Sequence, residues 1–245
     1  MPIHEQVVDI AVADRRIGGT IVSPSRLAPG VLFVHGWAGS QTQYLARARE
    51  LGNLGCVCLT FDLYGHAKTS SFQGTVTRED NLNDIVAAYD ALASLPLVDQ
   101  SAIGVIGSSY GGYLAAILTT LRPVKWLALR AAALYKDEDW SRRKQLLNRS
   151  ELTKYRLGIV KSSENRALAA CAQFQGDVLL VESEHDHLVP RGVTANYRTA
   201  FEKAHSLTVR VLEGADHALS EQRWQDAYTS HLKSWAAEVI ARARK

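Results

Sequence analysis

A serine in a glycine-flanked turn is the clearest candidate for chemistry in this sequence. Ser109 is the centre of Gly107-Ser108-Ser109-Tyr110-Gly111, a Gly-x-Ser-x-Gly pattern. The apolar run 103–106 precedes the pattern and an Ala- and Leu-rich run follows it, so we expect a strand to turn sharply into a helix there. Glycines two residues before and after the serine leave room where such a turn packs against itself. The helix N-terminus would direct backbone N–H groups towards the hydroxyl, which suits a nucleophile.

A serine hydroxyl is a weak nucleophile near neutral pH, so it needs a base and a group that orients the base. In open α/β sheets such groups gather at the carboxyl ends of the strands. Two later apolar runs, 178–181 and 207–212, are each followed by suitable residues, Asp186 after the first and His217 after the second. The chain order Ser109, Asp186, His217 is the order associated with this strand-turn-helix arrangement.

The elements that would position these residues alternate between strands and helices. Apolar or β-branched runs predict strands over residues 3–12, 15–22, 31–34, 56–61, 103–106, 124–131, 178–181 and 207–212. Helical spacing predicts helices over residues 44–54, 79–95, 192–204 and 220–241. The first two strands should form an antiparallel hairpin. The rest predict an α/β fold with a mostly parallel sheet of about eight strands and helices on both faces.

Residues 135–173 interrupt this alternation and contain charged segments with a helical pattern, such as 137–148. We expect a small helical lid insertion over one end of the sheet. The length of 245 residues suits a single domain over residues 1–245.

Composition excludes several classes of protein. Hydrophobic residues make up 47% and charged residues 22% of the chain, as in soluble globular proteins. A net charge of +3, spread along the chain, argues against nucleic-acid binding. No apolar run is long enough to span a membrane, and the start has no signal-peptide pattern, so we expect a cytoplasmic protein. The three cysteines have no metal-site spacing and favour buried thiols over disulfides.

With these residues in view, the sequence resembles the serine hydrolases of the α/β-hydrolase fold over nearly its whole length. The branches that it is most similar to are the esterases, the dienelactone-hydrolase-like proteins and the S9-peptidase-like proteins. The motifs that carry the resemblance follow in family order: His35-Gly36-Trp37, Asp62-Leu63-Tyr64-Gly65-His66, Gly107 to Gly111, Asp186 to Pro190, and Gly214 to His217.

The resemblance implies a role for each residue of the site. Ser109 would be the nucleophile, His217 the general base and then acid, and Asp186 the carboxylate that orients the histidine. The backbone N–H groups of Trp37 and Tyr110 would form the oxyanion hole. No metal or organic cofactor is needed for this chemistry.

Other acidic residues could orient His217 in place of Asp186. Glu182, Glu184 and Asp186 share one loop, and Asp186 is preferred because it matches the family's Asp-x-x-Val-Pro pattern, whereas Glu182 directly ends its strand. A variant family design takes the acid from the strand before the insertion, which would nominate Asp137 or Asp139 instead.

Eight histidines are present, so the base must also be distinguished. His35 precedes the glycine of the oxyanion loop and His66 lies in a Gly-His turn, and we expect both to be structural. Asp216 adjoins His217 in sequence, so its side chain should point away from the imidazole ring.

The resemblance places substrate specificity in the insertion and the loops near the site. We expect Trp37, Tyr110, Tyr135 and Trp140 to contact the substrate. Dienelactone-hydrolase-like relatives use cysteine as nucleophile, so serine favours ester or peptide acyl chemistry. We expect no β-propeller before the domain, which favours a small-molecule ester over a peptide. The alternatives are a small acyl-peptidase or thioesterase and a ligand-binding, receptor-like protein with little turnover. The sequence also allows the chain to form a homodimer.

Overall fold

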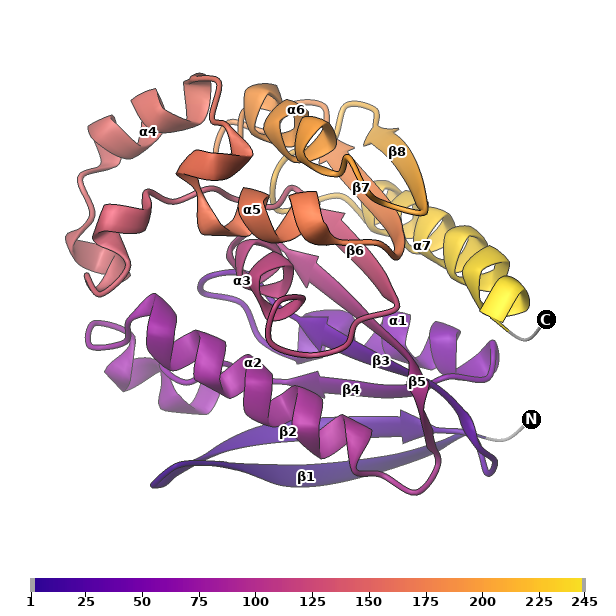
Figure 1. The fold of residues 1–245 in the computed structure, drawn as a ribbon. Coiled ribbons are helices and arrows are strands. Elements are labelled where there is room, and N and C mark those ends of the chain that lie inside the picture. Colours follow the sequence, from indigo (N-terminus) through magenta and orange to yellow (C-terminus); the bar gives the residue numbers. More distant parts are fainter. Residues whose placement is uncertain (1–2, 244–245) are drawn as a thin grey trace.

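The computed structural model describes residues 3–243, and its centre is an eight-stranded sheet (Figure 1). In chain order the strands are β1 (His4–Val12), β2 (Arg15–Ser23), β3 (Ala28–Val34), β4 (Val57–Phe61), β5 (Val98–Ser108), β6 (Trp126–Arg130), β7 (Asp177–Ser183) and β8 (Ser206–Leu212). Their spatial order is β1-β2-β4-β3-β5-β6-β7-β8. The β1–β2 and β2–β4 pairs are antiparallel, and β3 to β8 pair in parallel.

Helices cover both faces of this sheet. The helices α2 (Arg78–Ala93), α3 (Tyr110–Leu118), α5 (Arg166–Gln173) and α6 (Arg191–Ala200) pack on one face, in front in Figure 1. The helices α1 (Thr42–Asn53) and α7 (Gln222–Ala243) pack on the other face. The parallel strands β3 and β4 are buried throughout, because both of their faces are covered. The predicted α/β fold is confirmed.

The hairpin and the helix starts follow from local chemistry. All nine residues of β1 pair with β2, which confirms the hairpin that the alternating pattern predicts. The helix α2 begins with a capping box: the Thr77 hydroxyl accepts a hydrogen bond from the Asp80 N–H, and the Asp80 carboxylate accepts one from the Thr77 N–H. After β4 the chain makes a 3₁₀ segment, η1 (Ala67–Phe72), before this cap.

The segment between β6 and β7 departs from the prediction in one respect. Residues 137–148 form two 3₁₀ turns, η2 (Asp137–Asp139) and η3 (Lys144–Leu146), and not a charged α-helix. The helix α4 (Arg149–Leu157) begins only after Asn148, whose side chain accepts hydrogen bonds from the N–H groups of Ser150 and Glu151. Asparagine favours such a cap over a helix interior. A last turn, η4 (Ser162–Glu164), precedes α5, and the segment projects from the left-hand side of Figure 1.

Two further findings concern the whole described chain. Cys56, Cys58 and Cys171 are buried and take part in no disulfide. Across residues 3–243, none of the helices combines the length and the apolar character needed to cross a bilayer.

Candidate active site

The sharp turn that the glycine pattern predicts lies between β5 and α3. Ser109 connects the two elements with φ 51° and ψ −116°, in the left-handed half of backbone space. Three backbone hydrogen bonds hold it there. The Ser109 N–H donates to the Arg130 carbonyl at 2.9 Å, and the Ser109 carbonyl accepts from the N–H groups of Tyr113 at 3.1 Å and Ala133 at 3.0 Å. Strained geometry of this kind persists only where the surroundings fix it, and it is typical of functional residues.

The glycine two residues after the serine allows two loops to touch. A Cβ atom on Gly111 would lie 2.3 Å from the His35 carbonyl oxygen and 2.6 Å from that of Val34. Any larger residue would therefore separate the start of α3 from the end of β3. Gly107 is equally confined, since a Cβ there would lie 2.7 Å from the Gly111 carbonyl oxygen.

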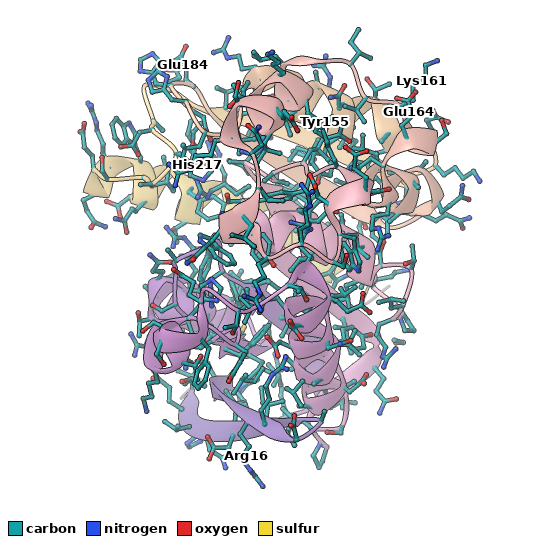
Figure 2. All side chains as sticks on the ribbon, turned by 90° about the vertical axis from the view of Figure 1, so that its left-hand side faces the viewer. Arg16, Tyr155, Lys161, Glu164, Glu184 and His217 are labelled. Atoms are coloured by element: carbon teal, nitrogen blue, oxygen red, sulfur yellow. The ribbon has the colours of Figure 1, made fainter. Side chains whose placement is uncertain are left out.

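The structure brings Ser109, His217 and Asp186 together from three separate loops. His217 Nε2 lies 3.0 Å from Ser109 Oγ, and His217 Nδ1 lies 2.6 Å from Asp186 Oδ2. The second carboxylate oxygen of Asp186 accepts hydrogen bonds from the N–H groups of Leu188 at 2.9 Å and Val189 at 2.7 Å. With Asp186 ionised, Nδ1 carries the proton and Nε2 is free to accept the serine proton. Figure 2 labels His217, in the loop before α7.

The competing acids of the same loop and of the insertion are engaged elsewhere. Glu184 accepts a hydrogen bond from the Gly214 N–H at 2.8 Å, which lowers its pKa. Asp137 accepts one from the Arg166 N–H at 2.9 Å. Burial raises the pKa of Glu182, at the end of β7.

Two other carboxylates also have partners of their own. Asp139 forms an ion pair with Arg142 at 3.3 Å. Asp216 turns towards the start of α7, where it accepts hydrogen bonds from the N–H and hydroxyl of Ser220, and these lower its pKa. Asp186 is therefore the carboxylate that contacts the ring of His217.

The loop after β3 lies against Ser109. Trp37 and Ser109 border the same cavity, and Ala38 adopts φ 59° as the loop turns towards α1. Tyr110 is the first residue of α3, so its N–H has no acceptor within the helix. The Tyr110 ring is buried, and its hydroxyl donates to Asn81 Oδ1 at 3.0 Å. Only the backbone of Tyr110 can therefore face a substrate.

His35 supports the loop after β3 through both of its ring nitrogens. Its Nδ1 donates to the Gly36 carbonyl at 2.7 Å, and its Nε2 accepts from the Leu63 N–H at 3.0 Å. The ring is fully buried, and burial lowers the pKa of His35 to about 4. Burial also lowers the pKa of His66, whose ring contacts those of His35 and Trp37. Both histidines occupy the structural positions predicted for them.

His35 should make the fold sensitive to acid. Between its ordinary pKa of 6.5 and about 4, the unfolded chain binds a proton that the folded chain does not, so stability falls as the pH falls through this window. The expected loss is about 3 kcal/mol of unfolding free energy, complete near the folded-state pKa. Urea unfolding at a series of pH values will measure it.

The variant His35→Gln can keep both hydrogen bonds without a titrating group, so its unfolding free energy should lack this part of the pH dependence. His4→Gln, at an exposed histidine, is the matched control and should retain it. A His35→Gln protein with the same pH dependence as the parent would contradict the prediction.

The cavity beside Ser109 has a volume of about 270 Å³. It lies on the α1 and α7 side of the sheet, and its lining includes Trp37, Arg47, Arg130, His217 and Tyr228. Neither Tyr135 nor Trp140 lines it. Tyr135 is 2% exposed and lies below the Arg156 guanidinium of α4, and the Trp140 indole donates to Glu79. Their contact with a substrate stays a prediction.

Three cationic residues near Ser109 and Trp37 lay outside the sequence-based prediction. Lys144 Nζ of η3 lies 4.3 Å from the centre of the Trp37 ring, and burial lowers the pKa of Lys144 to about 8. Arg47 and Arg130 line the cavity. An arginine ending an otherwise apolar strand is a signal that could have identified Arg130, whereas Lys144 and Arg47 resemble ordinary surface cations in the sequence. Within residues 3–243, no group of three histidine, cysteine or acidic side chains could hold a metal ion.

Comparison with protein families gives one match over most of the chain. The profile of the prolyl oligopeptidase family matches residues 41–243. Among curated proteins, none matches the sequence significantly.

Solved structures share the fold at low sequence identity. A dienelactone hydrolase from Anabaena variabilis is 19% identical with a TM-score of 0.71, and the match covers 97% of this chain and 99% of that chain. An esterase from Pyrococcus furiosus is 17% identical with a TM-score of 0.71, covering 97% and 94% respectively. An acylaminoacyl peptidase from Pyrococcus horikoshii is 14% identical with a TM-score of 0.73, covering 98% of this chain and 42% of that chain.

Proposed function

The chain belongs to the prolyl oligopeptidase family, as a serine hydrolase with the α/β-hydrolase fold, and from this premise we propose that it hydrolyses carboxylic esters of small molecules. The acyl group would be carried on Ser109. The observation that carries the proposal is the pair of hydrogen bonds that aligns Asp186, His217 and Ser109 at 2.6 Å and 3.0 Å. This is the arrangement of nucleophile, base and orienting acid that acyl transfer requires.

The reaction begins with proton transfer. Ser109 Oγ attacks the ester carbonyl carbon while His217 Nε2 takes the hydroxyl proton. The backbone N–H groups of Trp37 and Tyr110 stabilise the oxyanion of the tetrahedral intermediate. His217 then returns the proton to the leaving alcohol oxygen, which gives the acyl-enzyme. A water molecule, deprotonated by His217, attacks the acyl carbonyl, and the acid leaves as Ser109 regains its proton.

One observation favours a small ester: the cavity beside Ser109, at about 270 Å³, suits a compact group. A short acyl-peptide is the second candidate, because the family match is to prolyl oligopeptidases.

We further propose one domain over residues 1–245, with residues 135–173 acting as a lid. Lys144 of this segment packs over the Trp37 ring, and Arg156 donates to the carbonyls of Leu134 at 3.1 Å and Leu188 at 2.9 Å. These contacts join the segment to the oxyanion loop on one side and to the loop of Asp186 on the other.

Covalent labelling tests the proposal. A fluorophosphonate should modify the native protein once per chain, and peptide mass mapping should place the label on Ser109. Labelling should persist in Ser108→Ala and disappear in Ser109→Ala. Para-nitrophenyl acetate should be hydrolysed faster than an N-acetyl amino-acid anilide. An unlabelled native protein, or a label on another residue, would overturn the assignment, and preference for the anilide would favour the peptidase.

A further inference from the structure

The cavity beside the nucleophile contains two guanidinium groups and no carboxylate. Arg47 comes from α1 and Arg130 from the end of β6, and their guanidinium carbons lie 4.7 Å and 5.8 Å from the centre of the Tyr228 ring. The full lining consists of Gly36, Trp37, Ala38, Gly39, Gln43, Tyr44, Arg47, Ser108, Ser109, Arg130, His217, Ala218, Leu219, Gln225 and Tyr228. None of these residues is acidic, although Ser109 and His217 are among them.

Arg47 is 7% exposed and has only neutral partners. Its Nη1 donates to the Gln43 carbonyl at 2.9 Å, and its Nη2 lies 3.4 Å from the Gln225 carbonyl. Its Nε is buried and has no hydrogen-bond partner. The guanidinium also lies 4.7 Å from the centre of the Tyr228 ring. Carbonyl and ring contacts satisfy part of its hydrogen bonding, but they do not neutralise its charge.

Arg130 is 8% exposed, and its hydrogen-bond partners are also neutral. Its Nη1 donates to the His217 carbonyl at 2.9 Å, and its Nε lies 3.3 Å from Ser108 Oγ. Among the described residues, no carboxylate comes within 4.0 Å of either Arg47 or Arg130.

Three other arginines of the protein each have a carboxylate partner. Arg15 pairs with Asp84 at 2.8 Å, and Arg122 pairs with Asp90 at 2.6 Å. Arg49, two residues after Arg47 on the same helix, pairs with Glu5 at 2.6 Å. Burying a charge without a counter-ion costs several kcal/mol. Two such cations around one cavity produce a positive potential that an anion would relieve.

We propose that this cavity is a binding subsite for a carboxylate group carried by the ester substrate. The inference rests on the proposed function, because it assigns the cavity to the substrate of Ser109. Guanidinium groups bind carboxylates through paired, charge-assisted hydrogen bonds, and both Arg47 and Arg130 line the cavity. The enzyme would then select acidic esters over neutral esters of the same shape.

Matched pairs of substrates test this subsite. One pair carries the charge on the acyl side: phenyl hydrogen adipate and its neutral terminal amide. The other pair carries it on the leaving group: para-acetoxybenzoate and para-acetoxybenzamide. In at least one pair, kcat/KM should be about 10- to 100-fold higher for the acid, as expected when hydrogen bonds to a charged group are gained. No preference for the acid in either pair would overturn the proposal.

Variants then separate charge recognition from structural support. Arg47→Gln should lower the acid-to-amide ratio of kcat/KM by about 10-fold or more, and Arg47→Lys should restore part of that ratio because it keeps the charge but not the paired hydrogen bonds. Arg49→Gln, on the same helix but exposed, should leave both rates as in the parent protein. Equal losses on the acid and the amide in Arg47→Gln would show a structural role and overturn the subsite.

Direct binding distinguishes this inference from the proposed function. Calorimetry should detect binding of adipate, but not of adipamide, to the native protein, and Arg47→Gln should abolish it. If the protein hydrolyses no ester but binds adipate through Arg47, the proposed function fails and the anion site stands. If it hydrolyses esters without binding adipate or preferring acids, the subsite fails and the proposed function stands.

Discussion

Replacing Ser109 with alanine will lower kcat/KM for ester hydrolysis by about 10⁶-fold. Loss of the nucleophile leaves only the oxyanion donors and substrate binding, which together retain a small residual acceleration over water. The turn itself should survive, because the bonds that hold it are made by backbone atoms: the N–H to Arg130 and the carbonyl to Tyr113 and Ala133. Steady-state kinetics with para-nitrophenyl acetate, together with circular dichroism, will measure activity and folding separately.

Ser101→Ala is the matched control, since Ser101 lies on the same strand as the turn but is exposed at its other end. Its kcat/KM should equal that of the parent protein. A folded Ser109→Ala protein that keeps more than about 1% of the parent activity, far above the residual rate expected without a nucleophile, would mean that another residue attacks the ester.

Asp186→Asn should lower the rate by about 10⁴-fold while the protein stays folded. The asparagine carbonyl can still accept the N–H groups of Leu188 and Val189, which Asp186 Oδ1 accepts at 2.9 Å and 2.7 Å. Its NH₂ group would then face His217 Nδ1 and make that nitrogen an acceptor. The ring proton would move to Nε2, which could no longer take the proton from Ser109.

The competing carboxylates supply the comparison. Asp137→Asn and Asp139→Asn alter residues that contact Arg166 and Arg142, so their effect on kcat should be much smaller. A near-normal rate in Asp186→Asn, combined with a large loss in either of these variants, would transfer the role of the acid to the insertion.

The parts of the fold that were predictable depend on local patterns. The hairpin and the turn at Ser109 each rest on a few consecutive residues, since alternation and glycine spacing act over short distances. Strand ends were less predictable. For example, β3 begins at Ala28 instead of residue 31, because pairing with β5 extends to Val98 across an irregularity at Pro29 and Gly30. Such pairing depends on a strand far away in the sequence.

The candidate site could also be predicted from the sequence only in part. Ser109, Asp186 and His217 could be nominated because each follows an apolar strand and their order matches a known family. Arg47 and Lys144 could not, because their significance comes from burial beside residues distant in the sequence. The turns over residues 137–148 were also missed, since a charged segment with helical spacing can be held in shorter turns by contacts such as that of Trp140 with Glu79.

The dual role of Arg130 limits how the enzyme could be re-engineered. Its backbone carbonyl holds Ser109, while its side chain holds the backbone of His217, so one residue of β6 sets the separation of nucleophile and base. Substitutions at Arg130 would alter reactivity together with selectivity. The hydrogen bonds of Arg47 go to the Gln43 and Gln225 carbonyls and involve neither Ser109 nor His217. Directed evolution of a new substrate range should therefore succeed through substitutions on the α1 side of the cavity, whereas substitutions on the β6 side should also reduce activity.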